Sequence, residues 1–275
     1  MEKIINAVFP PRCVFCGAVG DVFCENCMST CSILQEQRCL LCDKPSENGK
    51  THLYHFFTHY GTYVGSNKVK LTQPTQIKDR LQLRDEESLV DVKKDIDSNS
   101  FTQLFVEKGY PSQLISPFIY ADKVRDCIRK SKYSSRLFAS LKRLSFEGVN
   151  IVYEWGYSFD DFVVVPIPVS KQKEKLRGFN QADIISKIFA KRFNLVVDFS
   201  ILARVKDKHA QHDLSRADRF KNIKGSFVSN EKAKGKKIIL VDDICTTGAT
   251  FLEASKILFE NGAIDVKCFS LSKRL

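Results

Sequence analysis

Apolar residues in the second half of the chain alternate between a pattern typical of strands and one typical of helices. The segment DFVVVPIP, residues 161–168, is a continuous apolar run, as expected of a strand buried in a parallel sheet. From Asn180 to Phe193, apolar side chains recur at helical spacing and predict an amphipathic helix. Further along, the pattern predicts a strand at 238–241, a helix at 250–259 and a closing strand at 264–271.

This alternation of strands with helices predicts an α/β fold, with a twisted, mostly parallel sheet of four or five strands flanked by helices on both faces. We expect this domain over residues 115–275, beginning with a short strand and a basic helix in FIYADKVRDCIRKSKY. Residues 1–55 are rich in cysteine and should form a small separate module. Residues 56–114 are mostly polar and charged, and are expected to be a linker or an insertion.

Charge and hydropathy narrow the range of partners and the compartment. The formal net charge of +11 favours anionic partners such as nucleotides, phosphates or nucleic acid, although an ordinary basic surface explains it equally well. No apolar run approaches the ~18 residues that a membrane helix requires. The apolar stretch before Pro10 is too short for a secretory signal, so we expect a cytoplasmic protein.

The cysteines cluster near the N-terminus in a spacing typical of a metal site. Seven of the ten lie between Cys13 and Cys42, and the first four form two C-x-x-C pairs: Cys13, Cys16, Cys24 and Cys27. Without an export signal, such clustering favours metal over disulfides. Four thiolates complete the tetrahedron that zinc prefers, and a site with no open position is structural. The alternatives are reduced core cysteines or disulfides.

A second zinc site is predicted from the next C-x-x-C pair. Cys39 and Cys42 are followed, ten and thirteen residues after Cys42, by His52 and His55, which are plausible ligand types. In the alternative interpretation the two cysteines pack against the first site and the histidines lie on the surface. His59 could also compete as a ligand.

The most informative stretch places two acids at the end of a predicted strand. Asp242 and Asp243 are followed by a small, hydroxyl-rich turn that begins a helix: Thr246, Thr247, Gly248, Ala249 and Thr250. Ligands bind at the carboxyl edge of α/β sheets, and phosphates bind at helix N-termini. Carboxylates only accept hydrogen bonds, so we expect them to bind the vicinal hydroxyls of a ribose whose 5-phosphate lies in the turn. The alternative is a capped helix with two solvated aspartates.

Two cationic segments could complete such a site. The first follows the strand at 161–168 and is predicted to be a loop that stabilises a leaving pyrophosphate, or else a solvated basic turn. Its residues are Lys171, Lys173, Lys175, Arg177 and Gly178. The second, residues 206–219, is predicted to be a mobile lid or a plain surface loop.

The stretch 238–250, IILVDDICTTGAT, resembles the phosphoribosyl-pyrophosphate signature of type I phosphoribosyltransferases. The signature consists of four apolar residues, two acids, two variable positions and then Thr-Thr-Gly-small-Thr. The resemblance implies that Asp242 and Asp243 bind the ribose hydroxyls and that residues 246–250 bind the 5-phosphate, with Mg²⁺ accompanying the ligand.

Further segments resemble the ComF family: FPPRCVFC with the following C-x-x-C, VVVPIPVSKQKEKLRGFNQA, and RVKDKHAQHDLSRADRFKNIKGSFV. Besides Arg177 and Gly178, the motif residues are Phe179, Asn180, Gln181, Gln211, Arg219 and Asn222. The resemblance covers residues 1–55 and about 115–275. It implies a zinc module joined to a phosphoribosyltransferase-like domain, and a link to competence and DNA uptake. Family members often have a cysteine at the position of His55, and their connector is usually shorter than residues 56–112.

Two functional hypotheses follow. In the first, the protein is a phosphoribosyltransferase, although no residue stands out as a base for an acceptor. In the second, it is a non-catalytic factor that handles single-stranded DNA and uses the site as a ligand sensor. The DNA would contact the zinc module and the basic span from Ala121 to Arg143, in which Tyr133 and Phe138 are interleaved. In the alternative, the basic span is simply an amphipathic helix with solvated charges. A base-salvage enzyme is a third hypothesis, but the sequence shows no recognisable base-reading hood.

Overall fold

A computed structural model describes residues 10–52, 55, 105–131, 135–205 and 216–275, and the structural statements below concern these residues. The centre of the fold is a six-stranded sheet in which every pairing is parallel. Its order is β1-β8-β7-β3-β4, and β2 also pairs with β8. The strands are β1 Gln113–Ile115, β2 Phe118–Ile119, β3 Phe162–Pro166, β4 Val196–Val197, β7 Lys237–Cys245 and β8 Asp265–Lys273. A separate antiparallel pair joins β5 Leu202–Arg204 to β6 Phe227–Ser229.

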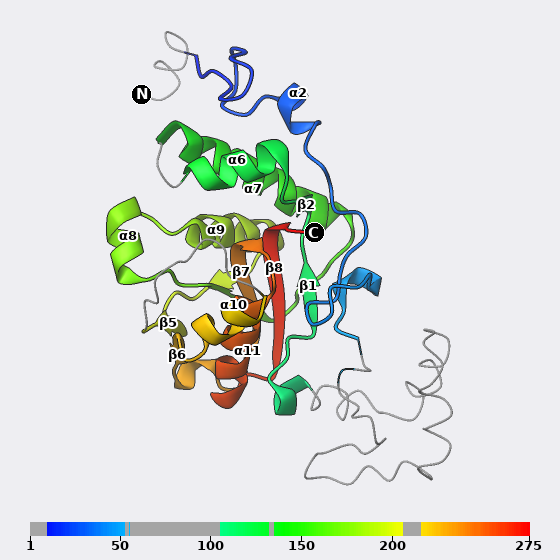
Figure 1. The fold of residues 1–275 in the computed structure, drawn as a ribbon, viewed down its shortest axis with the longest axis vertical. Coiled ribbons are helices and arrows are strands. Elements are labelled where there is room, and N and C mark those ends of the chain that lie inside the picture. Colours follow the sequence, from blue (N-terminus) through cyan, green and yellow to red (C-terminus); the bar gives the residue numbers. More distant parts are fainter. Residues whose placement is uncertain (1–9, 53–54, 56–104, 132–134, 206–215) are drawn as a thin grey trace.

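Helices cover both faces of this sheet, as the alternating pattern predicts (Figure 1). They are α2 Glu25–Met28, α6 Asp122–Ser131, α7 Ser135–Glu154, α8 Lys171–Arg177, α9 Gln181–Phe193, α10 Arg216–Ile223 and α11 Ala249–Glu260, with 3-10 turns η1 Glu47–Gly49 and η3 Glu231–Ala233. Side chains of β7 alternate between the two faces. Ile239 and Val241 pack in the cluster that includes α7 and α9, whereas Ile238 and Leu240 pack in the cluster that includes α11. The predicted α/β class is therefore confirmed.

Most of the predicted elements are present with small shifts in their ends. The predicted helix at 180–193 is α9, and Asn180 caps it by accepting a hydrogen bond from the amide of Ala182. Strand β7 extends past the expected end at Val241 as far as Cys245, and so contains both acids. The cationic segment at 171–177 is helix α8, so the prediction of a loop there is wrong.

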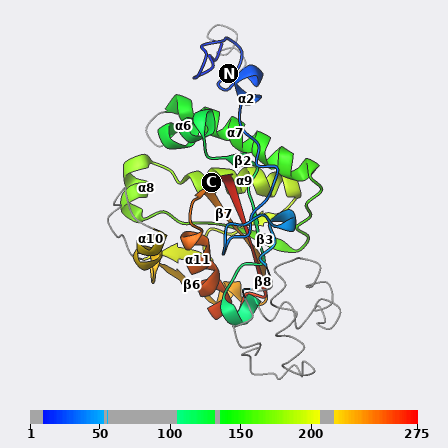
Figure 2. The ribbon, with the colours of Figure 1, turned by 45° about the vertical axis from the view of Figure 1, so that its right-hand side comes forward.

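The cysteine-rich segment begins beside α6 and α7, where α2 lies, and then runs along the β1 and β2 edge of the sheet (Figures 1 and 2). Ile33 forms a bridge with Phe118, and Lys50 forms one with Gln113. Phe23 is fully buried in the core cluster of α7 and α9. The N-terminal segment and the sheet therefore share one core. Among the described residues, no helix is both long and apolar enough to cross a membrane.

Candidate functional site

The first four cysteines converge on a single point. The sulfur atoms of Cys13, Cys16, Cys24 and Cys27 all lie within 4.8 Å of one another. Backbone hydrogen bonds shape the two knuckles: the amide of Gly17 donates to the carbonyl of Cys13, and the amide of Cys27 donates to that of Cys24. Four thiol sulfurs at this separation fit the tetrahedral shell of zinc.

The second predicted set converges in the same way. The ligand atoms of Cys39, Cys42, His52 and His55 lie within 4.8 Å of one another. Nδ1 of His52 lies 3.3 Å from the sulfur of Cys42, and Nε2 of His55 lies 3.5 Å from that of Cys39. Burial, together with the charges of His52 and Lys44, lowers the pKa of His55 to about 4, so its ring is neutral and can coordinate a metal at pH 7. Both sets therefore support structural zinc.

The paired acids lie at the carboxyl end of β7, as predicted. Asp242 pairs with Ser270 of β8, and both acids are half-buried. A carboxylate oxygen of Asp242 accepts a hydrogen bond of 2.8 Å from the amide of Asp243. The neighbouring strand β3 ends beside them, because Pro166 pairs with Val241. The acids and the segment that follows β3 thus share one edge of the sheet.

The turn after the acids, Thr246–Gly248, is named the phosphate turn here because phosphate is predicted to bind it. It leads directly into α11, which begins at Ala249. Gly248 is the N-cap residue and has a φ of 78°, a left-handed conformation that favours glycine. Thr246 and Thr247 are half-buried.

Three residues beside the phosphate turn were missed by the sequence interpretation: Leu40, Asp43 and Lys273. A Cβ atom placed on Gly248 would lie 2.6 Å from Cδ1 of Leu40. The turn therefore packs directly on residues 39–43, the C-x-x-C knuckle of the second metal site, which is called the second cysteine knuckle below. Lys273 is 3% exposed, forms a 2.8 Å ion pair with Asp43, and donates a 3.1 Å hydrogen bond to the carbonyl of Thr246. No spacing rule could have found this group, because Lys273 lies more than 200 residues after Leu40 and Asp43 in the chain.

The cationic residues after β3 lie on a short exposed helix instead of a loop. Lys171 and Lys175 of α8 are exposed, and Arg177 is half-buried. Gly178 follows with a φ of 76° and ends the helix. This helix extends from the same edge of the sheet that carries the acids, which is where a pyrophosphate would need positive charge.

The motif residues that follow α8 have structural contacts. Asn180 donates hydrogen bonds from Nδ2 to the carbonyl of Ile167 and to Asp183. Gln181, which is 2% exposed, donates from Nε2 to the carbonyl of Ile128. The ring of Phe179 packs edge-on against Phe138 of α7 at 4.7 Å. These residues tie the end of β3 to the helices on one face of the sheet.

Of the remaining motif residues, two lie on α10 and one lies outside the described residues. Arg219 and Asn222 are half-buried on α10, which packs against α11. Gln211 and most of the predicted lid, residues 206–215, lie outside the described residues.

The basic span is two helices, α6 and α7, instead of one. On α6, Val124, Cys127 and Ile128 are buried, which fits the amphipathic alternative. Three exposed cations of α6 surround Asp126: Arg125, Arg129 and Lys130 lie 3.9, 4.0 and 3.1 Å from its carboxylate. Tyr133 lies outside the described residues.

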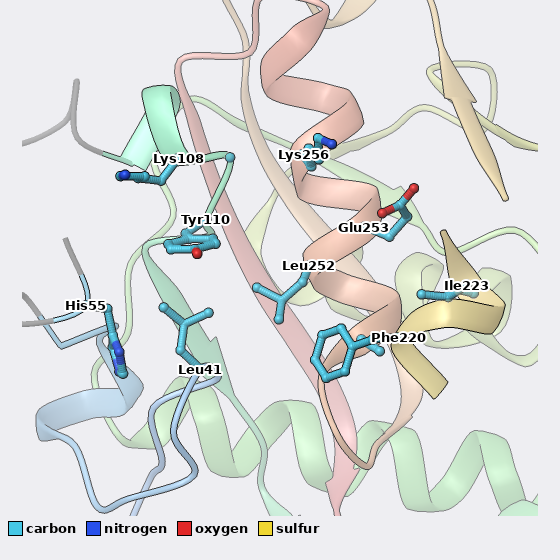
Figure 3. A pocket seen from close by; sticks show the side chains of 11 residues that line it. Leu41, His55, Lys108, Tyr110, Phe220, Ile223, Leu252, Glu253 and Lys256 are labelled. Carbon is cyan, nitrogen blue, oxygen red and sulfur yellow. The ribbon is translucent and has the colours of Figure 1, made fainter. Parts of the chain in front are cut away.

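A pocket of about 440 Å³ lies between α11, α10 and the segments that carry Leu41 and His55 (Figure 3), and neither acid of the pair lines it. Leu41 lines it from the Cys39–Cys42 knuckle, His55 lines it from the segment after η1, and Phe220, Leu252 and Glu253 line it from α10 and α11. Of the predicted phosphate-binding residues, the pocket includes Ala249 alone. The pocket is therefore distinct from the predicted ribose site.

The N-terminal segment matches a known family. Residues 4–54 match the family described as Double zinc ribbon domain. This range contains the ligands Cys13 to His52, and His55 lies one residue beyond it. The match agrees with the two ligand clusters.

The chain also resembles three named bacterial proteins. It is 29% identical over 174 residues to "DNA utilization protein YhgH" of Escherichia coli (strain K12), covering 62% of this chain and 76% of the relative. It is 33% identical over 113 residues to "Competence protein F" of Haemophilus influenzae, covering 40% and 49%. It is 30% identical over 168 residues to "Competence protein ComFC" of Bacillus subtilis, covering 57% and 62%.

Among solved structures, a glutamine phosphoribosylpyrophosphate amidotransferase from B. subtilis is 17% identical, with a TM-score of 0.36 over 53% of this chain and 30% of that chain. A likeness this distant adds nothing to the fold assignment, which rests on the strand order and the helix layers. The double zinc ribbon match and the competence-protein relatives confirm that this chain resembles the ComF family.

Proposed function

We propose that the protein binds phosphoribosyl pyrophosphate with Mg²⁺ at the carboxyl edge of the sheet, and that it is a phosphoribosyltransferase. One observation carries the proposal: the acid pair Asp242 and Asp243 lies near the end of β7, and the phosphate turn joins that end directly to α11. This order places acceptors for sugar hydroxyls next to donors for a phosphate. The signature at 238–250 agrees with this proposal.

The phosphate end of the ligand would meet the N-terminus of α11. This helix has 12 residues, and its first backbone amides point toward the turn. Together they carry a partial positive charge, worth roughly 0.3–1 kcal/mol for an anion at an exposed helix end. The hydroxyls of Thr246, Thr247 and Thr250 add donors at the same place.

The ribose would lie across the end of β7. The carboxylates of Asp242 and Asp243 accept hydrogen bonds from its vicinal hydroxyls. Loss of pyrophosphate from the anomeric carbon leaves positive charge on the sugar ring, and nearby carboxylates stabilise that charge. The two acids would therefore both bind the sugar and lower the barrier to bond cleavage.

The pyrophosphate would face the segment after β3. Lys171, Lys175 and Arg177 place cations at this edge of the sheet, where they can balance the charge of the leaving group. Bound Mg²⁺ would supply further positive charge to the same group. The incoming nucleophile is not identified by any residue of the site.

The test is calorimetric titration of the protein with phosphoribosyl pyrophosphate in the presence of Mg²⁺. We expect Asp242→Asn with Asp243→Asn to weaken binding at least tenfold while the far-UV circular dichroism spectrum stays unchanged. The matched control is Asp160→Asn with Asp161→Asn, an adjacent acid pair at the opposite, amino end of β3. Equal affinity in the two double variants would overturn the proposal. Pyrophosphate release across a panel of bases then tests for turnover.

The name "DNA utilization protein" of one relative favours a second function in the handling of DNA, and we propose single-stranded DNA as the ligand. The exposed cations Arg125, Arg129 and Lys130 of α6 could neutralise backbone phosphates, although Asp126 lies between them. We expect oligonucleotide binding to weaken steeply with salt, and to weaken further in a variant in which all three cations are glutamine. Oligonucleotide binding that changes neither with salt concentration nor with these substitutions would exclude α6 as the contact.

A further inference from the structure

The second cysteine knuckle, residues 39–43, contacts the phosphate turn, although it lies about 200 residues earlier in the chain. We propose that this knuckle is a clamp for the phosphate turn, so that metal at the second site and ligand at the turn support one another. The inference deepens the proposed function and rests on it for the identity of the ligand. Its structural basis is the contact between the knuckle, the turn and the end of β8.

The first part of the clamp is a buried cation. Lys273 is 3% exposed, and a buried ammonium is costly unless it is paired and hydrogen-bonded. Its Nζ lies 2.8 Å from the carboxylate of Asp43, and it donates to the carbonyls of Thr246 at 3.1 Å and Arg274 at 3.0 Å. The position of Lys273, and with it the carbonyl of Thr246, therefore depends on Asp43. Lys273 is thus a positioning residue.

The second part of the clamp is a close apolar contact. Leu40 is 3% exposed, and its side chain and carbonyl lie against the bare Cα face of Gly248. Because Gly248 is the N-cap residue of α11, Leu40 packs at the point where the phosphate-binding amides begin. The knuckle therefore restrains the turn at both ends, at Thr246 through charge and at Gly248 through packing.

The metal ligands fix the residues that make these contacts. Asp43 directly follows Cys42 and has a φ of 63°, a left-handed conformation that is unfavourable for a residue with a side chain. The amide of Asp43 donates to the carbonyl of Cys39, which closes the knuckle. A metal that joins Cys39 to Cys42 would hold Asp43 in this conformation and Leu40 on the outside of the bend.

The clamp predicts how the second metal site and the phosphate turn affect each other. Loss of the second metal would release Asp43 and Leu40, and the turn would then sample conformations that do not bind phosphate. By linkage, ligand in the turn would tighten metal binding at the second site by the same factor. The first metal site has no such contact among the residues of the turn that the structure describes, so its loss should not have this effect.

Hydrogen–deuterium exchange of the ligand-free protein tests the clamp. We expect Asp43→Asn and His52→Ala to raise the exchange rate of the amides of residues 246–250 at least tenfold. The matched controls are Glu47→Gln, which removes an exposed ion pair of the same module, and Cys16→Ser, which removes a ligand of the first site. Amides of residues 238–241 in the sheet report whether each variant is folded.

The outcomes separate the clamp from the proposed function. Unchanged exchange at 246–250, or an equal rise in the controls, would overturn the clamp. If Asp43→Asn does not fold, Leu40→Ala tests the other contact of the clamp, the one with Gly248, without leaving a buried charge unpaired. The second experiment is titration with phosphoribosyl pyrophosphate. If the wild-type protein does not bind this ligand, the proposed function is refuted, but the exchange rates still test the clamp. If wild type binds and the clamp variants bind equally well, the coupling is refuted.

Discussion

Gly248 offers a quantitative test of the contact between the cysteine knuckle and the phosphate turn. In Gly248→Ala, the new methyl group would lie 2.6 Å from Cδ1 and 3.1 Å from Cγ of Leu40, so the leucine must move. Overpacking of this kind costs about 1–3 kcal/mol. The φ of 78° adds about 1–2 kcal/mol for any L-residue with a side chain. We therefore expect a loss of about 2–5 kcal/mol in the free energy of unfolding.

A double-mutant cycle separates these two costs. Leu40→Ala alone should cost about 2–5 kcal/mol, as for other buried leucines. In the double variant the side-chain clash is gone, because Cδ1 and Cγ of Leu40 are absent. The backbone cost at Gly248 and the 3.2 Å approach to the carbonyl oxygen of residue 40 persist. The double variant should therefore be about 1–3 kcal/mol more stable than the sum of the single effects predicts.

Urea denaturation of the zinc-loaded protein, followed by far-UV circular dichroism, measures all four free energies. Gly178→Ala is the matched control, since Gly178 has a φ of 76° but a Cβ atom added to it would meet nothing within 4 Å. It should show the backbone cost alone and no coupling to Leu40. Single effects that add within about 0.5 kcal/mol would refute the contact between Leu40 and the turn.

Three further predictions concern the rest of the molecule. Cys13→Ser should lower the zinc content from two ions per chain to one, and an unchanged content by elemental analysis would count against this ligand. Asn180→Ala should cost about 2 kcal/mol of unfolding free energy, because it removes the cap of α9 and the hydrogen bond to the carbonyl of Ile167. Asn180→Asp should keep the cap, so equal urea midpoints for the two variants would contradict this prediction. Burial raises the pKa of Asp265 above 3.8, partly offset by its bond from Ser112, so the charged form destabilises the fold at neutral pH. Asp265→Asn should therefore have a higher free energy of unfolding than wild type at pH 7. In urea denaturation at a series of pH values, this difference should disappear as the pH falls through the raised pKa to below 3.8. A difference that grows as the pH falls would refute the prediction.

Local patterns in the sequence account for much of the fold. A continuous apolar run such as the one before Pro168 is typical of a strand buried on both faces, and the helical spacing after Asn180 is typical of a helix buried on one, so the pattern alone identifies β3 and α9. The two zinc sites are equally local, because C-x-x-C spacing brings two ligands over one cation. Helix α8 was missed because its sequence, KQKEKLR, has only one apolar residue, the 80% exposed Leu176, and so shows no helical periodicity.

The environment of the phosphate turn could not be predicted in this way. Its position after β7 follows from the acids and the glycine, which are neighbours in sequence. Its contacts with Leu40 and Lys273 depend on how the cysteine-rich segment lies along the sheet. That arrangement is set by the edge strands β1 and β2, whose short sequences carry no signal for a partner far away in the chain.

The strand order also has a consequence for how the chain folds. Strands β1 and β2 both pair with β8, more than 150 residues later, so neither has its sheet partner until β8 has been synthesised. Leu114, Ile115 and Phe118 are at most 2% exposed in the finished sheet, and would face solvent during that interval. Long-range parallel pairing is slow, and unpaired apolar edges are prone to aggregation. A nascent chain of this protein would therefore benefit from chaperone protection until its final strand arrives.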